Sequence, residues 1–361
     1  MTLFSLPPNC TLRLTRPVGR TALLAALFAL ILVGAAEFLV RQPGVQERLP
    51  VPSIGSTRDD FEIKVYLADG ILDGDGRIDC LFLGSSVVWR GLNPRLFEAA
   101  YQAAGGETLR CFNFALAEIT LSDAPIMTEF LIRRYAPRLL VYGLSPRDFS
   151  ATVDNGRPTD PARIAWMRYQ RGEPDVNGWL IDHLLSYRYY LAVHDWMAPG
   201  FQGRLDQRRR SERELSALDG HTPSAEVFDL DGDDPWWRAR KVFKNYHTAP
   251  DALEGMRDLV ALADRYPATT LVLAEIPLHP AIYTDFLPAA DYDALIAAIE
   301  ASTSAQSVPF LRSAALVLPP DGVWKDSIHL NGRGAALFSA WLGEQTAHAL
   351  GTPYAAAWPQ D

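Results

Sequence analysis

The chain has 361 residues, 48% of them apolar, and a formal net charge of −9. This length and apolar content allow a sizeable core, and the acidic balance argues against nucleic acid as the main partner. The sequence contains no Cys-x-x-Cys, His-Glu-x-x-His, phosphate-binding glycine loop or dinucleotide fingerprint, so it indicates no metal site and no cofactor.

Two contrasting segments open the chain. Residues 1–20 are polar and carry Arg13, Arg16 and Arg20, whereas residues 21–40 are nearly all apolar. About 20 such residues span a bilayer as one helix, and basic residues before it keep the amino end in the cytoplasm. The sequence therefore predicts a cytoplasmic tail, a single-pass signal anchor in the cell membrane and an extracytoplasmic domain.

A cleaved signal peptide is the alternative to an anchor. Gly34-Ala35-Ala36 would pass as a small-residue cleavage site. Apolar residues continue beyond it to Val40, and Glu37 is the only interruption, which favours the anchor.

The region after the apolar segment divides by composition. Residues 41–60 are rich in proline and glycine and are predicted to be a linker. Residues 61–350 are predicted to form the catalytic domain, beginning with a short helix or strand at 61–72. Residues 351–361 are predicted to be a C-terminal tail.

The first predicted strand is a short apolar run at residues 80–83, which ends in Gly84-Ser85-Ser86. Such a run is typical of a buried parallel strand. Ligands and catalytic groups lie beyond the carboxyl ends of these strands. Ser86 is thus a candidate nucleophile, although small residues are also common in plain turns.

An alternating pattern follows, with strands predicted at 108–115 and 138–143 and helices at 93–104 and 122–136. Asn93-Pro94 supplies the cap and first-turn residue of the first of these helices. Strand–helix alternation is typical of a parallel sheet.

Residues 149–246 interrupt this alternation and are predicted to be a helical insertion or lid beside the active site. Aromatic side chains are frequent there, namely Tyr187, Tyr189, Tyr190, Trp196, Trp236 and Trp237. They would either stack on sugar rings or pack a small helical subdomain.

The alternation then resumes, with helices predicted at 250–265, 292–301 and 332–350 and strands at 269–276 and 308–311. His279 follows the fourth strand, either lining the pocket or lying in a plain loop. The predicted fold class is α/β, with a five-stranded parallel sheet covered by helices on both faces.

A candidate base comes late in the chain. Asp326 and His329 are three residues apart, just before the closing helix. On a turn, this spacing lets the carboxylate hold one imidazole nitrogen while the other faces a nucleophile, as in serine–histidine–aspartate sites.

Together these stretches resemble the SGNH (GDSL-like) hydrolase superfamily. Gly84-Ser85-Ser86 matches the first block, Asn113-Phe114-Ala115 resembles the second, residues 143–148 the third, and Asp326-Ser327-Ile328-His329 matches the last. The resemblance implies a three-layer flavodoxin-like α/β/α sandwich. It also implies Ser86 as nucleophile, His329 as general base and then acid, and Asp326 as the residue that orients it.

The two inner blocks depart from the family pattern. Ala115 and Glu118 replace the usual glycines of the second block, and the third block lacks its asparagine. Similar departures are typical of the membrane-anchored branch that includes teichoic-acid D-alanylation and alginate-acetylation proteins. By this resemblance the amides of Ser86 and Ala115 would hold the oxyanion, and Asn113 would position the loop.

Three functions remain open from the sequence. The leading hypothesis is serine-dependent acyl or acetyl transfer, or ester hydrolysis, on an exported polysaccharide or cell-envelope glycan, with a membrane O-acyltransferase as a candidate partner. The first alternative is a catalytically degenerate scaffold that binds polymer or such an acyltransferase. The second is a simple extracytoplasmic esterase or lipase.

Cys80 and Cys111 are predicted to lie at matching heights of the first two strands. An oxidising compartment would permit a disulfide between them, but adjacent parallel strands rarely offer suitable geometry, which favours two free thiols.

Overall fold

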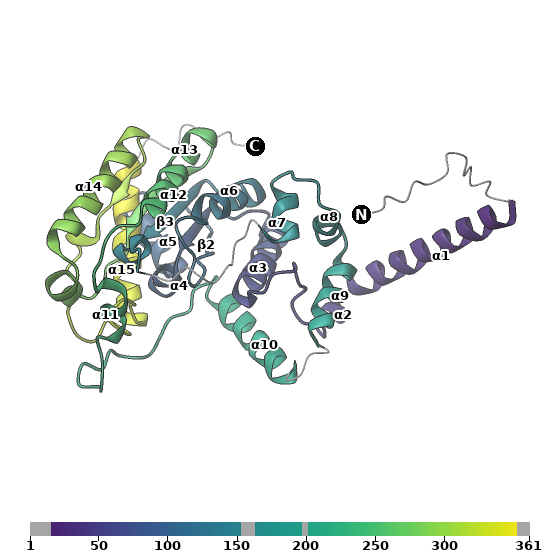
Figure 1. Cartoon of the computed structure of the whole chain (residues 1–361), viewed down its shortest axis with the longest axis horizontal. Helices are drawn as coiled ribbons and strands as arrows, with labels where there is room; N and C mark the ends of the chain where they lie inside the picture. Colours follow the sequence, from purple (N-terminus) through teal and green to yellow (C-terminus); the bar gives the residue numbers. More distant parts are fainter. Residues whose placement is uncertain (1–15, 153–162, 197–200, 352–361) are drawn as a thin grey trace, which may run out of the picture.

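The computed structural model describes residues 16–152, 163–196 and 201–351 (Figure 1). Most of the predicted cytoplasmic tail, Cys10 and nearly all of the predicted C-terminal tail lie outside these residues. The strands are β1 (Cys80–Gly84), β2 (Cys111–Asn113), β3 (Leu139–Leu144), β4 (Thr270–Glu275) and β5 (Phe310–Leu311). The helices before β4 are α1 (Arg16–Val40), α2 (Pro43–Gln46), α3 (Asp59–Asp75), α4 (Ser86–Gly91), α5 (Pro94–Ala103), α6 (Ala124–Tyr135), η1 (Pro146–Phe149), α7 (Ala165–Gln170), α8 (Val176–His183), α9 (Leu185–Trp196), α10 (Phe201–Ala217), α11 (Trp237–Phe243), α12 (Pro250–Val260) and α13 (Leu262–Arg265). After β4 come η3 (Ile282–Phe286), α14 (Ala289–Ala305), η4 (Ser313–Ala315) and α15 (Gly332–Leu350).

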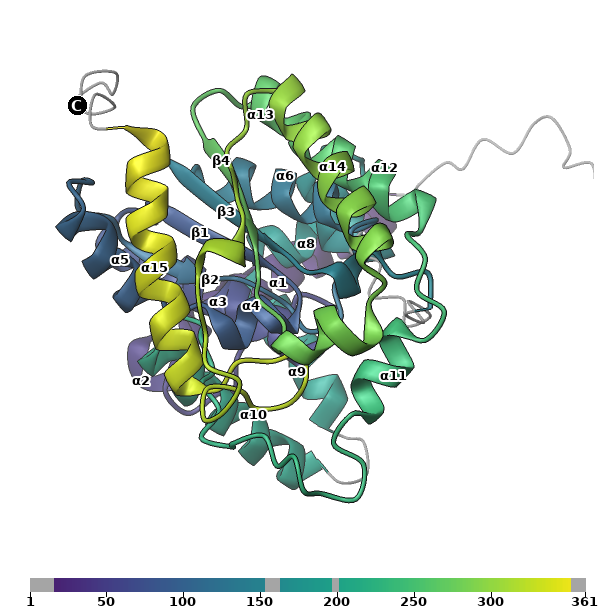
Figure 2. The ribbon, with the colours of Figure 1, turned by 90° about the vertical axis from the view of Figure 1, so that its left-hand side faces the viewer.

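The five strands form one parallel sheet in the order β2-β1-β3-β4-β5 (Figure 2). The predicted five-stranded parallel sheet is therefore confirmed, and this order is the flavodoxin-like one. In such sheets the strand order reverses between β1 and β3, and ligands bind outside the carboxyl ends of the strands at that point. The fold thus opens a site next to the residues that follow β1 and β3.

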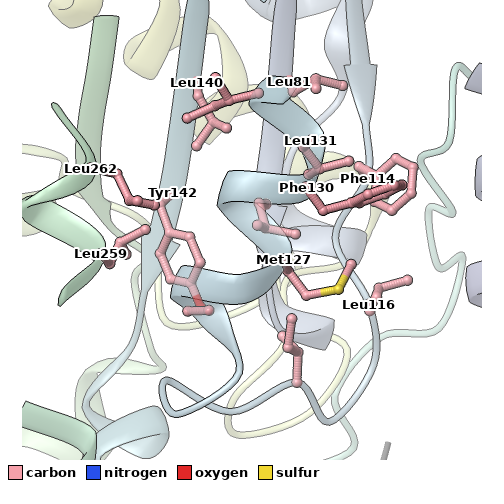
Figure 3. Packing of buried hydrophobic residues seen from close by; sticks show 14 of the residues in the cluster. Leu81, Phe114, Leu116, Met127, Phe130, Leu131, Leu140, Tyr142, Leu259 and Leu262 are labelled. Carbon is pink, nitrogen blue, oxygen red and sulfur yellow. The ribbon is translucent and has the colours of Figure 1, made fainter. Parts of the chain in front are cut away.

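Helices cover both faces of the sheet because successive strand residues point to opposite sides. Leu81 and Leu140 point to the face that α3, α6, α12 and α14 cover, where Phe130 of α6 and Leu259 of α12 pack (Figure 3). Phe82 points to the opposite face, which α4, α5 and α15 cover. The apolar core therefore lies in two layers, and the strands are buried on both sides as their composition predicts.

Several boundaries differ from the sequence prediction. The strand predicted at 108–115 is confined to Cys111–Asn113. Before it, the Arg110 amide donates to the Asp79 carboxylate, whereas after it the Phe114 amide still donates to the β1 carbonyl of Phe82. The segment predicted as a helix or strand at 61–72 is the longer helix α3. Local pattern does not encode these long-range partners, so it placed the ends only approximately.

The amino-terminal helix α1 contains one span, Gly19–Val40, that is long and apolar enough to cross a membrane. Near its end, the Glu37 carboxylate accepts hydrogen bonds from the amides of Leu185 (3.1 Å) and Ser186 (2.8 Å), at the start of α9. A carboxylate at a helix N-terminus pairs with amides that have no partner inside the helix. The apolar helix is thus joined to the insertion by the one acidic residue that interrupts it.

The predicted linker at 41–60 packs against the domain. Val51 and Ile54 are buried, and the Glu62 carboxylate of α3 accepts hydrogen bonds from the Ser53 hydroxyl and the Ile54 amide. The connection between α1 and the sheet is therefore held by tertiary contacts.

Cys80 and Cys111 are paired in the register of β1 and β2, and both are buried free thiols. Neither is bridged in this structure, as the strand geometry favoured.

Candidate active site

Ser86 is the first residue of α4 and follows β1 after a sharp turn. Gly84 makes this turn possible, since its φ is +147° and a Cβ there would lie 2.4 Å from Val88 Cγ2 and 2.7 Å from the Gly143 carbonyl oxygen. The Ser86 amide is at the helix start and has no acceptor among the described residues. The turn therefore presents both the hydroxyl and a free N–H at the carboxyl edge of the sheet.

The structure brings Ser86, His329 and Asp326 together. Ser86 Oγ lies 2.8 Å from His329 Nε2, although 243 residues separate them in sequence. His329 Nδ1 lies 2.9 Å from Asp326 Oδ2 and 3.0 Å from Oδ1. Because the carboxylate accepts from Nδ1, the neutral imidazole carries its proton there, and Nε2 accepts from the serine.

The loop that carries Asp326 and His329 is fixed by its own backbone. Asp326 Oδ1 accepts hydrogen bonds from the amides of Ile328 and His329, each at 3.0 Å. Asn331 caps α15 by accepting from the Arg333 and Gly334 amides. The short Asp-x-x-His spacing thus encodes a preorganised turn, and the cap fixes where α15 begins.

Burial and charge tune the acid–base pair. Burial is the largest effect on His329 and lowers its pKa; the hydrogen bond that Nδ1 donates to Asp326 opposes this, and the positive charges of Arg90 and Arg238 add to the lowering. Burial by itself would raise the pKa of Asp326, but its hydrogen bond with His329 outweighs it, and this pKa lies below the usual value. At neutral pH the histidine is therefore a neutral base beside an ionised carboxylate.

Asn113 connects the second block to the nucleophile's helix. Its Nδ2 donates to the carbonyls of Val88 (3.0 Å) and Leu92 (2.8 Å), and its Oδ1 accepts from the Ala115 amide at 3.1 Å. The expected loop-positioning contacts of Asn113 are thus present. The Ala115 amide, however, is already engaged by Asn113, so its role as an oxyanion donor stays a proposal, whereas the Ser86 amide is free.

Lys64 of α3 binds the backbone of the loop at Asn113–Ala115, and the sequence analysis did not identify it. Its side chain is fully buried, and Nζ donates to the carbonyls of Asn113 (2.9 Å) and Ala115 (2.5 Å) while it lies 4.8 Å from the Trp89 ring centre. Burial lowers its pKa well below the usual lysine value. A signal existed in the sequence, since Lys64 lies three residues after Phe61 and four before Ala68 on one helix face, and both are buried.

The structure defines the conformation of the two places where the chain departs from the SGNH pattern, Glu118 in the second block and the third block without its asparagine. Glu118 has φ +59°, the left-handed region that glycine usually occupies. In the third block, Ser145 stands after β3 and forms a capping box with Asp148 around η1. Burial raises the pKa of Asp148, and the adjacent Arg147 guanidinium opposes that effect. These side chains hold the third block in place without the amide group that an asparagine would supply.

His279 lies outside the catalytic arrangement. Its Nε2 donates to the Pro320 carbonyl at 3.0 Å, its Nδ1 accepts from the Ala281 amide, and its ring packs against Trp236 and Trp324. It is a structural histidine at the carboxyl end of β4.

Two guanidinium groups flank the histidine–aspartate pair and were also missed. Arg238 Nε lies 3.5 Å from Asp326 Oδ2, and Arg90 follows Ser86 by one helical turn on α4. Both charges act on His329. Within the described residues, no group of three or more histidine, cysteine, aspartate or glutamate side chains is arranged to hold a metal ion.

Comparisons with known proteins give structural likenesses only. No family model and no curated protein matches the chain. Among solved structures, a lipase/acylhydrolase from Enterococcus faecalis is 13% identical, with 75% of this chain and 96% of that chain covered at a TM-score of 0.38. Est24, a carbohydrate acetylesterase from Sinorhizobium meliloti, is 11% identical. The match covers 75% of this chain and 99% of that chain at a TM-score of 0.36. A GDSL-like lipase from Parabacteroides merdae is 14% identical. The match covers 75% of this chain and 97% of that chain at a TM-score of 0.36. The function proposed below rests on this chain's own site.

Proposed function

We propose that the chain is an SGNH-type serine enzyme that transfers an acyl group through Ser86. The hydrogen-bonded series Ser86–His329–Asp326 carries this proposal, because a neutral buried base lies 2.8 Å from an otherwise unactivated hydroxyl. Residues in such a series are seldom assembled from distant segments without a chemical role.

In the proposed reaction, His329 Nε2 takes the proton of Ser86 as Oγ attacks the acyl carbonyl carbon. The resulting oxyanion accepts a hydrogen bond from the free Ser86 amide, and the alcohol leaves with the proton that His329 returns. A second hydroxyl, from water or from an acceptor, then gives its proton to His329 and attacks the acyl-serine. This step releases the acid or the new ester and restores Ser86.

We infer that the substrate is an exported glycan. Trp237 has 47% of its surface exposed, and the Arg238 guanidinium lies 4.5 Å from its ring centre while also contacting Asp326. An exposed aromatic plane against the guanidinium that contacts Asp326 suits a sugar ring, and the positive charges of Arg90 and Arg238 suit an acidic one. Tyr189 and Trp236, by contrast, pack within the fold.

Transfer is tested with the purified full chain in neutral detergent. We expect slow turnover of p-nitrophenyl acetate, faster turnover when an acidic polysaccharide is added, and ester left on the polymer. Trp237→Ala should lose most of the polymer effect yet keep the small-ester rate. Trp179→Ala, equally exposed at 45% but on α8, is the control and should behave as the wild type.

Two outcomes would contradict transfer. Rapid hydrolysis of small esters with no polymer modified would indicate a plain esterase. No acyl-enzyme and no turnover would indicate a degenerate scaffold that binds polymer or a membrane acyltransferase, a role that the engaged Ala115 amide specifically favours.

The proposed location is outside the cytoplasm, with α1 as a retained anchor. Arg13 and Arg16 precede the apolar span, Arg20 lies at its start, and Glu37 joins the span to α9. Fusions made after Arg58 should be active with a phosphatase that works only after export. Activity of a reporter that works only in the cytoplasm would contradict this topology.

A further inference from the structure

A pocket whose lining includes none of Ser86, His329 and Asp326 lies where α1 meets the domain. Its volume is about 610 Å³, and its lining comes from the α1–α2 junction, α3, β2, α9 and the end of α10, including Arg41, Tyr66, Asp69, Arg188 and Tyr189. In Figure 1, α2 and α9 lie at the base of α1, with α3 beyond them. The pocket therefore opens next to the point where the apolar helix ends.

Arg188 is the unusual residue of this pocket. Its Nε and Nη2 atoms are buried and have no hydrogen-bond partner within the described part of the chain, and burial lowers its pKa. The carboxylates whose charges act on Arg188 are already engaged: Asp69 binds Arg134 and Tyr135, and Glu62 binds Arg208. Buried guanidinium N–H groups that lack an acceptor are unfavourable, and Asp69 and Glu62 act on Arg188 only through their charges. Arg188 is therefore able to pair with a further anion.

The other charges in the pocket define the missing half. Among the described lining residues, three guanidiniums face five carboxylates. Arg41 pairs with Glu37, and Arg110 pairs with Asp75 and Asp219. This excess of negative charge disfavours a ligand that is only anionic. It suits one whose phosphate meets Arg188 and whose cationic group meets the acidic rim, where Asp73 is exposed.

We propose that this pocket binds the zwitterionic phosphodiester head group of a membrane lipid, with the phosphate on Arg188 and the amine toward the acidic rim. The lipid is favoured as the source because Arg41, the first residue after α1, lines the pocket. The inference rests on the proposed membrane anchoring and not on the acyl chemistry. Its consequence is a domain held against the bilayer through a bound lipid as well as through α1.

The test measures thermal unfolding of the full chain in neutral detergent. Short-chain phosphatidylethanolamine at saturation should raise the midpoint by about 3 °C or more, whereas phosphatidylglycerol should raise it less. Arg188→Gln should abolish the response. Arg210→Gln removes the same charge from an exposed position on α10 and should respond like the wild type.

Soluble O-phosphoethanolamine and inorganic phosphate separate the sources of the ligand. A shift with O-phosphoethanolamine equal to that with lipid would support the head-group chemistry but reject the membrane as its source. An equal shift with inorganic phosphate or phosphatidylglycerol would contradict the proposal that the ligand is zwitterionic. No shift with any probe, or the same shift in Arg188→Gln, would overturn the site.

A lipid-free measurement guards against a variant that merely folds poorly. Since Nε and Nη2 have no hydrogen-bond partner among the residues that the structure describes, Arg188→Gln should unfold at the same or a higher temperature than the wild type in detergent alone. A lower midpoint would show that Arg188 is paired within the fold and would refute the proposal. Ser86→Ala should respond to lipid like the wild type, so failure of this site is distinguishable from failure of the proposed acyl transfer.

Discussion

Replacing Ser86 with alanine is expected to abolish covalent labelling by a serine-directed fluorophosphonate and to reduce acyl turnover by about 10⁴-fold or more. The hydroxyl is the only group that the described site places against His329 Nε2, so its loss leaves the base with nothing to activate. Labelling is read by intact-protein mass spectrometry, and turnover by release of p-nitrophenol.

Ser85→Ala is the matched control for this prediction. Ser85 is the adjacent hydroxyl, but it is almost fully buried and forms no hydrogen bond with His329. The variant should therefore label at a rate close to that of the wild type. Undiminished labelling of the Ser86 variant would place the nucleophile elsewhere and remove the basis of the proposed function.

Replacing the base should have a comparably large effect. His329→Ala should slow labelling and turnover by about 10³- to 10⁴-fold, because members of one catalytic unit fail together. Asp326→Asn should also reduce turnover strongly, since an amide side chain can donate to Nδ1 and favour the wrong tautomer of His329. Both effects are measured as kcat/KM on the same small ester.

The pH profile tests the same pair by a separate readout. A general base acts when neutral, and burial lowers the pKa of His329, so kcat/KM should fall only as the pH drops below the usual histidine range. Arg90→Gln and Arg238→Gln each remove a positive charge that lowers this pKa, so the acid limb should move to higher pH. Asp326→Asn removes the carboxylate that raises it, so the limb of the residual activity should move lower. A limb that stays fixed in all three variants would assign the titration to another group.

Each charge variant has an internal check. Arg90 and Arg238 are proposed to contact the glycan and not the reacting atoms, so their replacement should change the position of the acid limb while leaving fluorophosphonate labelling at its plateau close to wild type. Loss of labelling at every pH would indicate instead that these side chains are needed to hold the site together.

The sequence by itself determined the features that depend on neighbours along the chain. The apolar runs predicted the parallel strands, and Asn93-Pro94 predicted the start of α5, because capping and strand burial are decided within a few residues. The spacing of Asp326 and His329 predicted their contact for the same reason: a turn of three residues brings the carboxylate to Nδ1. The closing helix at 332–350 was predicted with its observed bounds, since Asn331 caps it locally.

Only the tertiary structure decided the contacts that join distant segments. No local pattern places Ser86 against His329 across 243 residues, or Lys64 Nζ against the carbonyls of Asn113 and Ala115. The same holds for Arg188, because the lack of acceptors for its Nε and Nη2 within the described ranges is visible only once burial and competing ion pairs are known. Periodicity and capping act over one or two turns of chain. The partner of a buried donor or charge, in contrast, is set by how whole helices pack on the sheet, and this packing cannot be predicted from the local patterns of a single sequence.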